Sequence, residues 1–182
     1  CCIFNYAPHY RSSIYQLMDK ELDCDFYFGA NLGNDNNIKK MDLTLLEGFK
    51  REYNSIGKRY KWQKGIIQQA FKDYNIYIIT GDSISSIIFM FFCKLLNKKV
   101  YIWTHGVKNL NVRNRYEKSL YHLATGLFLY GNYGKSNMLK YGINTEKLHV
   151  VYNSLDYSLQ LDIRLKLKQS NIYVDYFKNN DP

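Results

Sequence analysis

Short apolar segments alternate with segments of helical periodicity along most of the chain. Apolar runs of strand length, most of them continuously hydrophobic, lie at 3–6, 25–28, 76–80, 100–103, 127–130 and 148–152, with a weaker run at 43–46. Continuous apolar runs are typical of parallel strands that helices cover on both faces. The pattern therefore predicts an α/β fold, a Rossmann-like doubly wound and mainly parallel sheet with helices on both faces.

The segments between these strands carry helix signals. The expected N-terminal caps are Ser13 in a capping box with Gln16, Asp82 or Ser83, and Asn132. The helix expected over 84–96 is apolar almost all round, which predicts that it is buried. Another amphipathic helix is expected over 112–123, and the helix after Asn132 should end at Lys140 because Gly142 follows as a stop signal.

Composition narrows the class of protein. Hydrophobic side chains make up 46% of the 182 residues and there are only two prolines, which excludes a disordered chain. No apolar run approaches the roughly 18 residues that a membrane span requires. Four cysteines lack the spacing of a metal site, so we interpret them as small apolar residues in a reducing, cytoplasmic protein. No metal and no cofactor is expected.

The chain is strongly basic, with a formal net charge of +9. This charge favours an acidic partner: nucleic acid, anionic lipid or a phosphorylated metabolite. Many of the basic residues lie in segment 31–64, which fits the alternation least well. We interpret this segment as a solvated edge of the sheet with its loops. The alternative is a dedicated surface for an anionic ligand or a membrane.

Candidate binding residues follow the predicted strands, because ligands of an open parallel sheet bind beyond the carboxyl ends of its strands. They are His9, Tyr10 and Arg11 after the first strand, Gly81 and Asp82 after 76–80, Thr104, His105 and Gly106 after 100–103, and Gly131 and Asn132 after 127–130. Each has a structural alternative: a turn glycine, a helix cap or a surface ion pair. Their shared edge favours a cleft in which His105 is a titratable donor.

Several well-known motifs are absent from the sequence. There is no GxGxxG after the first strand, and no GxxxxGK[ST], HExxH, GxSxG or zinc-ligand spacing. These absences count against dinucleotide oxidoreductases, P-loop NTPases, zinc proteases and α/β-hydrolases.

Five segments carry a resemblance to a known family. They are YAPHYR at 6–11, IYIITG at 76–81, YIWTHG at 101–106, GLFLYG at 126–131 and the run from Lys140 to Asp156. Together they resemble the N-terminal domain of glycosyltransferase family 4, whose members are GT-B enzymes with two Rossmann-like domains. The most specific parts are Thr104-His105-Gly106 and residues 150–156, which are similar to the family's IPNGxD run although Ser154 stands where that run usually has Gly.

The resemblance implies a retaining glycosyltransferase that moves a sugar from a nucleotide-sugar donor to a polysaccharide or lipid-linked acceptor, with no required metal. It implies that residues 1–156 form the acceptor-side domain and 157–182 a linker or helix to a C-terminal donor domain in cis, so this chain alone should be inactive. By position His105 is the histidine that faces the donor sugar and serves catalysis. The loop 8–11 matches the acceptor loop but lacks the glycine pair that many members have there.

Other functions stay open at this stage. A nucleic-acid-binding module would use the basic charge and many tyrosines, but the aromatic residues lie mainly in strands expected to be core, so no nucleic acid is expected as partner. A stand-alone sugar-phosphate or nucleotide-binding α/β protein would need no second domain. Within the glycosyltransferase hypothesis, the basic and aromatic residues 58–62 suggest peripheral contact with the anionic inner face of the cell membrane.

Overall fold

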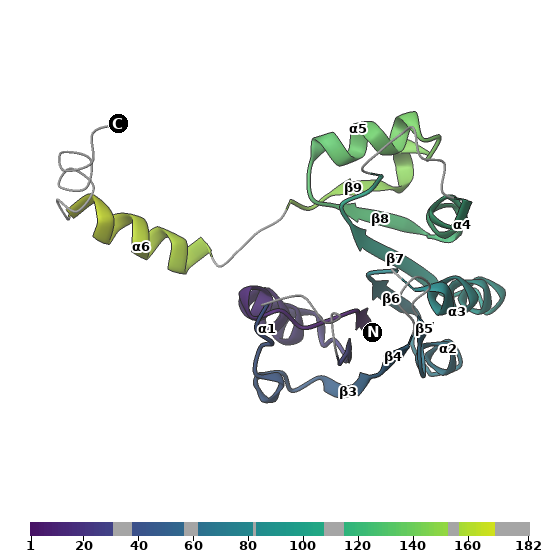
Figure 1. The fold of residues 1–182 in the computed structure, drawn as a ribbon, viewed down its shortest axis with the longest axis horizontal. Helices are drawn as coiled ribbons and strands as arrows, with labels where there is room; N and C mark the ends of the chain where they lie inside the picture. Colours follow the sequence, from purple (N-terminus) through teal and green to yellow (C-terminus); the bar gives the residue numbers. More distant parts are fainter. Residues whose placement is uncertain (31–37, 57–61, 82, 108–114, 153–156, 170–182) are drawn as a thin grey trace.

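The computed structural model describes residues 1–30, 38–56, 62–81, 83–107, 115–152 and 157–169. Its centre is a seven-stranded sheet of order β3-β2-β1-β6-β7-β8-β9, in which every pairing is parallel (Figure 1). The strands are β1 (Cys2–Phe4), β2 (Phe26–Gly29), β3 (Phe49–Tyr53), β6 (Ile76–Ile79), β7 (Lys99–Thr104), β8 (Gly126–Leu129) and β9 (Leu148–Val150). The predicted Rossmann-like, doubly wound architecture is confirmed.

Helices cover both faces of this sheet. On one face α1 (Ser12–Leu22) packs Tyr15 against the rings of Phe4 and Phe28. The other face is covered by α2 (Ile66–Gln69), α3 (Ile84–Leu95), α4 (Arg115–Leu123) and α5 (Asn132–Lys140). The chain winds outward from β1 in one direction and from β6 in the other. Right-handed crossovers therefore place the two sets of helices on opposite faces.

The segment 31–64 contains the largest differences from the sequence prediction. The strand predicted at 43–46 is wrong: Leu43–Leu45 forms a 3-10 helix, η2, because the Asp42 carboxylate accepts a hydrogen bond from the Thr44 N–H at 3.0 Å. The strand forms instead at β3, which is the edge of the sheet. For residues 49–53 the interpretation as a sheet edge is thus confirmed, and β4 (Ser55–Ile56) and β5 (Trp62–Gln63) add an antiparallel pair that was not predicted.

The predicted complete burial of helix α3 is also wrong. Phe89, Met90 and Cys93 are buried, but Phe91 is 51% exposed and Leu95 is 66% exposed. The helix forms part of an outer layer, so only one of its faces meets the sheet although apolar side chains surround it.

Of the predicted caps within the described residues, Ser83 alone occupies an N-cap position, and its side chain makes no capping hydrogen bond. Helix α1 begins at Ser12 with Arg11 at its N-cap, and Gly131 rather than Asn132 is the N-cap of α5. Ser83 is the N-cap residue of α3, as predicted, but its hydroxyl lies within hydrogen-bonding distance of the Ser85 and Ser86 hydroxyls and bonds no backbone N–H of the helix. The predicted end of α5 is confirmed: the helix ends at Lys140, and the Gly142 N–H bonds the carbonyl of Leu139.

The remaining elements lie near the end of the described chain. The short η3 (Thr145–Lys147) leads into β9, and α6 (Tyr157–Gln169) lies apart from the sheet (Figure 1), with exposed side chains at 157 and 159–167. The placement of a domain boundary at residue 156 stays a prediction. In the described part of the chain, no helix combines the length and the apolar character needed to cross a bilayer. All four cysteines are free thiols, and three of them are buried.

Candidate functional site

A cavity of about 250 Å³ opens beyond the carboxyl ends of four strands, beside the point between β1 and β6 where the winding direction reverses. Its lining residues follow or end β1, β6, β7 and β8, apart from Ile38: Asn5, Tyr6, Pro8, Tyr10, Arg11, Ile38, Thr80, Trp103, Thr104, His105 and Tyr130. Such a switch point is where ligands of open α/β sheets bind.

Arg11 is the basic residue that lines this cavity. It ends the 3-10 helix η1 (His9–Arg11), which follows β1 closely. Its guanidinium donates a hydrogen bond to the Tyr130 hydroxyl and lies 5.0 Å from the centre of the Trp103 ring. Burial lowers the pKa of Arg11, but Tyr130 and Tyr15 raise it more, and the net shift is upward. The cavity therefore contains a permanent cation held against aromatic rings.

Aromatic rings form the wall against which Arg11 lies. The Trp103 and Tyr130 rings are 6.1 Å apart, and the His105 ring lies 4.2 Å from that of Tyr130. The indole Nε1–H of Trp103 is buried and has no hydrogen-bond partner among the described residues. Burial raises the pKa of Tyr130 even though Arg11 opposes the shift, so this hydroxyl stays protonated. Flat apolar faces beside hydrogen-bond donors suit a sugar ring, which has C–H faces and an edge of hydroxyls.

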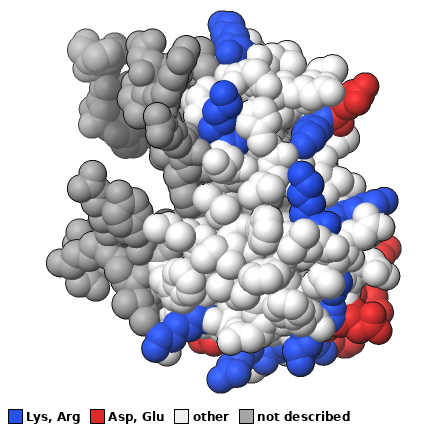
Figure 2. All heavy atoms as spheres, turned by 90° about the vertical axis from the view of Figure 1, so that its right-hand side faces the viewer, with Lys and Arg blue, Asp and Glu red and all other residues white. Residues whose placement is uncertain are grey.

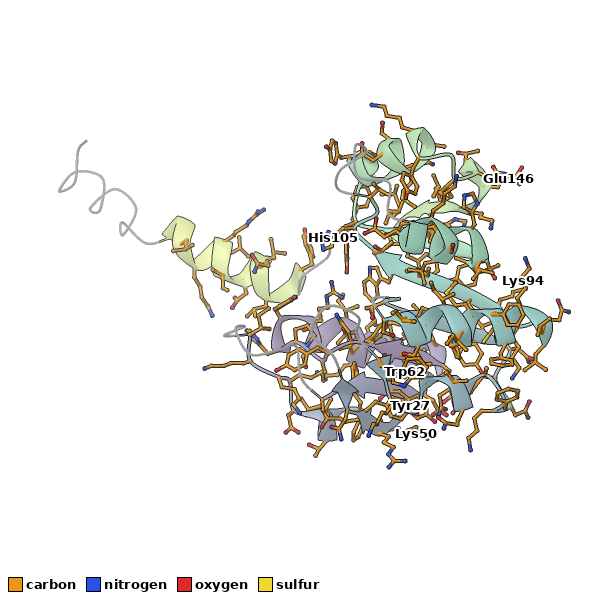
Figure 3. All side chains as sticks on the ribbon, turned by 45° about the vertical axis from the view of Figure 1, so that its right-hand side comes forward. Tyr27, Lys50, Trp62, Lys94, His105 and Glu146 are labelled. Atoms are coloured by element: carbon orange, nitrogen blue, oxygen red, sulfur yellow. The ribbon has the colours of Figure 1, made fainter. Side chains whose placement is uncertain are left out.

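Two glycines hold His105 at the mouth of the cavity. Gly106 has a φ of +76°, and a Cβ there would lie 3.1 Å from the Met138 side chain. In α5, a Cβ on Gly134 would lie only 2.8 Å from the carbonyl oxygen of His105. The helix can therefore approach the loop closely, and the His105 side chain is exposed at the cavity rim. Figure 3 shows this side chain facing away from the helical layer.

The structure brings four of the ten predicted site residues into the cavity wall: Tyr10, Arg11, Thr104 and His105. Thr104 also accepts a hydrogen bond from the Gly106 N–H at 3.1 Å, which fixes the turn after β7. Tyr10 is 42% exposed at the rim. Tyr10 and Arg11 follow β1, Thr104 ends β7 and His105 follows it; β1 and β7 are not neighbours in the sheet because β6 lies between them.

The other predicted residues do not line this cavity. His9 points outward, with its Nδ1 3.1 Å from the Lys39 carbonyl oxygen. Gly81, with a φ of +69°, makes a turn against Leu120, which is the structural alternative considered for it. Gly106 acts through the backbone, and Gly131 and Asn132 begin α5 outside the cavity. Asp82 lies outside the described residues.

Sequence reasoning missed the aromatic wall. Trp103 and Tyr130 were assigned to strands and therefore to the core. The available signal was their position: Trp103 is the next-to-last residue of β7 and Tyr130 directly follows β8, at the edge where Arg11 emerges. Among the described residues, no cluster of three His, Cys, Asp or Glu side chains could hold a metal ion.

Comparison with known proteins identifies the fold. No protein-family model and no curated protein matches the sequence. One similar solved structure is the UDP-GlcNAc 2-epimerase from Neisseria meningitidis bound to UDP-GlcNAc, with a TM-score of 0.55, 16% identity, and coverage of 98% of this chain and 52% of that one. Another is Anabaena Alr3699/HepE in complex with UDP and glucose, with a TM-score of 0.54, 12% identity, and coverage of 91% and 50%.

A third similar structure is the lipopolysaccharide outer core galactosyltransferase WaaB, with a TM-score of 0.51, 15% identity, and coverage of 85% of this chain and 45% of that one. The chain has a GT-B-type half-domain fold. It spans about half the length of these structures. The expected GT-B half is thus confirmed as a fold, while the resemblance to family 4 stays a prediction.

Proposed function

We propose that this chain is the N-terminal, acceptor-side half of a retaining glycosyltransferase. It would take a sugar from a nucleotide-sugar donor and pass it to a polysaccharide or lipid-linked acceptor, with the donor domain following in cis. The observation that carries this proposal is the cavity at the switch point, where Arg11 lies against Trp103 and an exposed His105 stands at the rim. The similar structures, one of a galactosyltransferase and others with bound UDP or UDP-GlcNAc, support it.

The residues of the cavity have distinct proposed roles. His105 donates a hydrogen bond to a donor-sugar hydroxyl or to the charge that develops as the diphosphate leaves. Arg11 and Tyr10 hold acceptor hydroxyls, and Trp103 and Tyr130 offer ring faces to the acceptor sugar. Donors that are fixed before the reaction lower the barrier because they need no reorganisation in the transition state. The mechanism we propose requires neither a metal nor a cofactor.

The test uses the longer protein encoded by the complete reading frame. We expect a second α/β domain with a Glu-x7-Glu pattern beyond Pro182, and transfer of radiolabelled sugar from a UDP-sugar to a glycan acceptor with retention of configuration. His105→Ala should lower kcat by about two orders of magnitude. His122→Ala, at an exposed position on α4, is the matched control and should leave kcat unchanged.

Two results would contradict the proposal. An unchanged kcat in His105→Ala would remove this residue from catalysis. Conversion of UDP-GlcNAc to its 2-epimer without any acceptor would assign the chain to the chemistry named for several of the similar structures instead.

Peripheral membrane contact is a further part of the proposal, as is a cytoplasmic location. Residues 57–61 lie outside the described residues, and the neighbouring Trp62 is 38% exposed. We expect binding to anionic liposomes that disappears at high salt, because salt screens exposed charges. Equal binding to neutral liposomes would contradict the proposed membrane contact.

Tight, salt-sensitive binding of single-stranded RNA in a filter assay would instead favour the nucleic-acid alternative.

A further inference from the structure

A second and larger cavity lies away from His105, at the edge of the sheet. It is an open groove of about 580 Å³ between strands β2 and β3 and helix α2. Figure 3 shows Tyr27 and Lys50, which line this groove, at the lower end of the molecule and His105 well above them. No step proposed above uses the groove.

The groove carries an excess of positive charge. Its lining includes four basic side chains and one acidic side chain, Lys50, Arg51, Lys64, Lys72 and Glu52. Lys50 pairs with Asp25 at 3.0 Å, and Glu52 pairs with Lys40 at 2.8 Å. Within the described part of the chain, no carboxylate pairs with the other three bases. In Figure 2, basic side chains are spread over the whole height of the face shown, and at its lower end, the level at which β3 and α2 lie in Figure 1, acidic side chains lie beside them.

The floor of the groove is neutral, polar and aromatic. The rings of Tyr27 and Tyr53 stack with their centres 5.6 Å apart and their planes 4° apart. Gln69 is 6% exposed, and its Nε2 donates to the Tyr53 hydroxyl at 2.5 Å. Its Oε1 has no hydrogen-bond partner among the described residues. A buried amide oxygen without a partner loses free energy of hydration, which a donor group of a ligand would restore.

Backbone geometry keeps this floor open. Gly65 has a φ of +87°, and a Cβ there would lie 2.6 Å from the Tyr53 ring, so only glycine lets the chain pass over that ring into α2. Burial raises the pKa of the Tyr53 hydroxyl to about 12, although Arg51 opposes the shift. Tyr53 is therefore a neutral hydroxyl, and Arg51 supplies positive charge beside it.

We propose that this groove binds a phosphate ester of a polyol or sugar. Arg51, Lys64 and Lys72, which pair with no carboxylate among the described residues, would hold the phosphate, because charge-assisted hydrogen bonds to phosphate are about twice as strong as neutral ones. The amides of Asn54, Gln68 and Gln69 supply the donors and acceptors that hydroxyl groups need. A groove of about 580 Å³ is in the size range of small-molecule sites and exceeds what phosphate alone would fill.

The experiment is a calorimetric titration of the 182-residue chain with glucose 6-phosphate and glycerol 3-phosphate. We expect saturable, salt-sensitive binding of one or both, and at least about tenfold weaker binding of inorganic phosphate. The double variant Arg51→Ala/Lys64→Ala changes only exposed side chains and should lose binding by about tenfold or more. Lys94→Ala, at an exposed lysine of α3 outside the groove, is the control for loss of a positive charge elsewhere on the surface and should bind as the parent does.

A second variant tests the floor. Gln69→Glu keeps the side-chain shape but adds a negative charge, so it should weaken phosphate-ester binding, while circular dichroism checks that it folds. Vesicles that contain phosphatidylglycerol carry the same chemistry on a lipid headgroup. Vesicle binding that glycerol 3-phosphate displaces and that Arg51→Ala/Lys64→Ala abolishes would assign the site to a headgroup. Binding of the soluble esters without vesicle binding would assign it to a free metabolite.

Other results would overturn the inference. These are no saturable binding of either ester, equal binding of glucose, or an equal loss in Lys94→Ala. Tighter binding of single-stranded RNA that the same double variant abolishes would also overturn it and make the groove a nucleic-acid surface. None of these results depends on sugar transfer. A negative result for the phosphate-ester site therefore does not contradict the proposed glycosyltransferase function, and absence of sugar transfer does not contradict the phosphate-ester site.

Discussion

At the scale of single residues, Arg11 joins the candidate site to the stability of the fold. It is partly buried, donates to Tyr130 and lies against the Trp103 ring. The sequence placed it at the right edge, because it follows the first strand closely. The sequence could not reveal its aromatic neighbours, since they come from strands more than 90 residues further along the chain.

Replacing the Arg11 guanidinium by an ammonium group should destabilise the fold. Arg11→Lys keeps the charge but loses the planar group that fits Trp103 and Tyr130, so we expect the free energy of unfolding to fall by about 1–2 kcal/mol. Urea denaturation measures this. Arg164→Lys, at an exposed arginine of α6, should leave the free energy of unfolding unchanged. Equal stability of the two variants would mean that the Arg11 contacts contribute nothing.

Tyr15, which interacts with Arg11, predicts that the free energy of unfolding depends on pH in the alkaline range. Burial raises the pKa of Tyr15 to about 12 from an ordinary value of 10.0. Between these values Tyr15 keeps a proton in the folded state that it loses in the unfolded state. The contribution of Tyr15 to the free energy of unfolding is therefore fully present below about pH 10 and is lost as pH rises through about 12. Unfolding measured from pH 9 to 12 should show this loss. Tyr15→Phe should reduce it, and Tyr133→Phe, at a residue 77% exposed, should not.

At the scale of elements, the contact between α5 and the His105 loop is the most specific feature. An alanine in a helix is normally more stable than glycine by about 1 kcal/mol. At Gly134, however, the new Cβ would lie 2.8 Å from the His105 carbonyl oxygen, so the helix or the loop must move. The position was not predicted as part of the site, because a glycine within a helical pattern gives no sign of what approaches it.

We therefore expect Gly134→Ala to lower the free energy of unfolding by about 1–3 kcal/mol, the typical cost of overpacking. Ser136→Ala is the control within the same helix, since this side chain is exposed. It should be neutral in the same urea titration. A stabilising effect of Gly134→Ala would show that the loop yields easily and does not fix His105.

Elements also show where local patterns mislead. The helix over 84–95 has apolar side chains all round, yet its exposure depends on whether another layer covers its outer face. Strand β3 carries Lys50, Arg51 and Glu52 and so lacks an apolar run, but edge pairing with β2 is enough to form it. The hydrophobic periodicity of a segment predicts which of its faces is apolar. It cannot predict how many of these faces other elements cover.

At the scale of the whole molecule, the chain spans about half the length of the similar structures. The candidate cavity opens beyond the carboxyl ends of the strands, where the proposed second domain would complete a cleft. Under the proposed function, we expect the 182-residue chain alone to give no turnover with a UDP-sugar and a glycan acceptor, and we expect turnover once the proposed donor domain is joined to it. A radiolabel transfer assay compares the two. Turnover by the 182-residue chain alone would show that the site is complete without a second domain.

The sequence by itself determined the α/β class, the parallel order of most strands and the edge at which Arg11 and His105 lie, because these follow from local periodicity and from chain connectivity. Only the tertiary structure decided which side chains meet: the wall of Trp103 and Tyr130, the approach of Gly134 to the His105 loop, and the basic groove beside β3. Those contacts join residues far apart in sequence, and their distances depend on twist, register and packing, which no local pattern encodes.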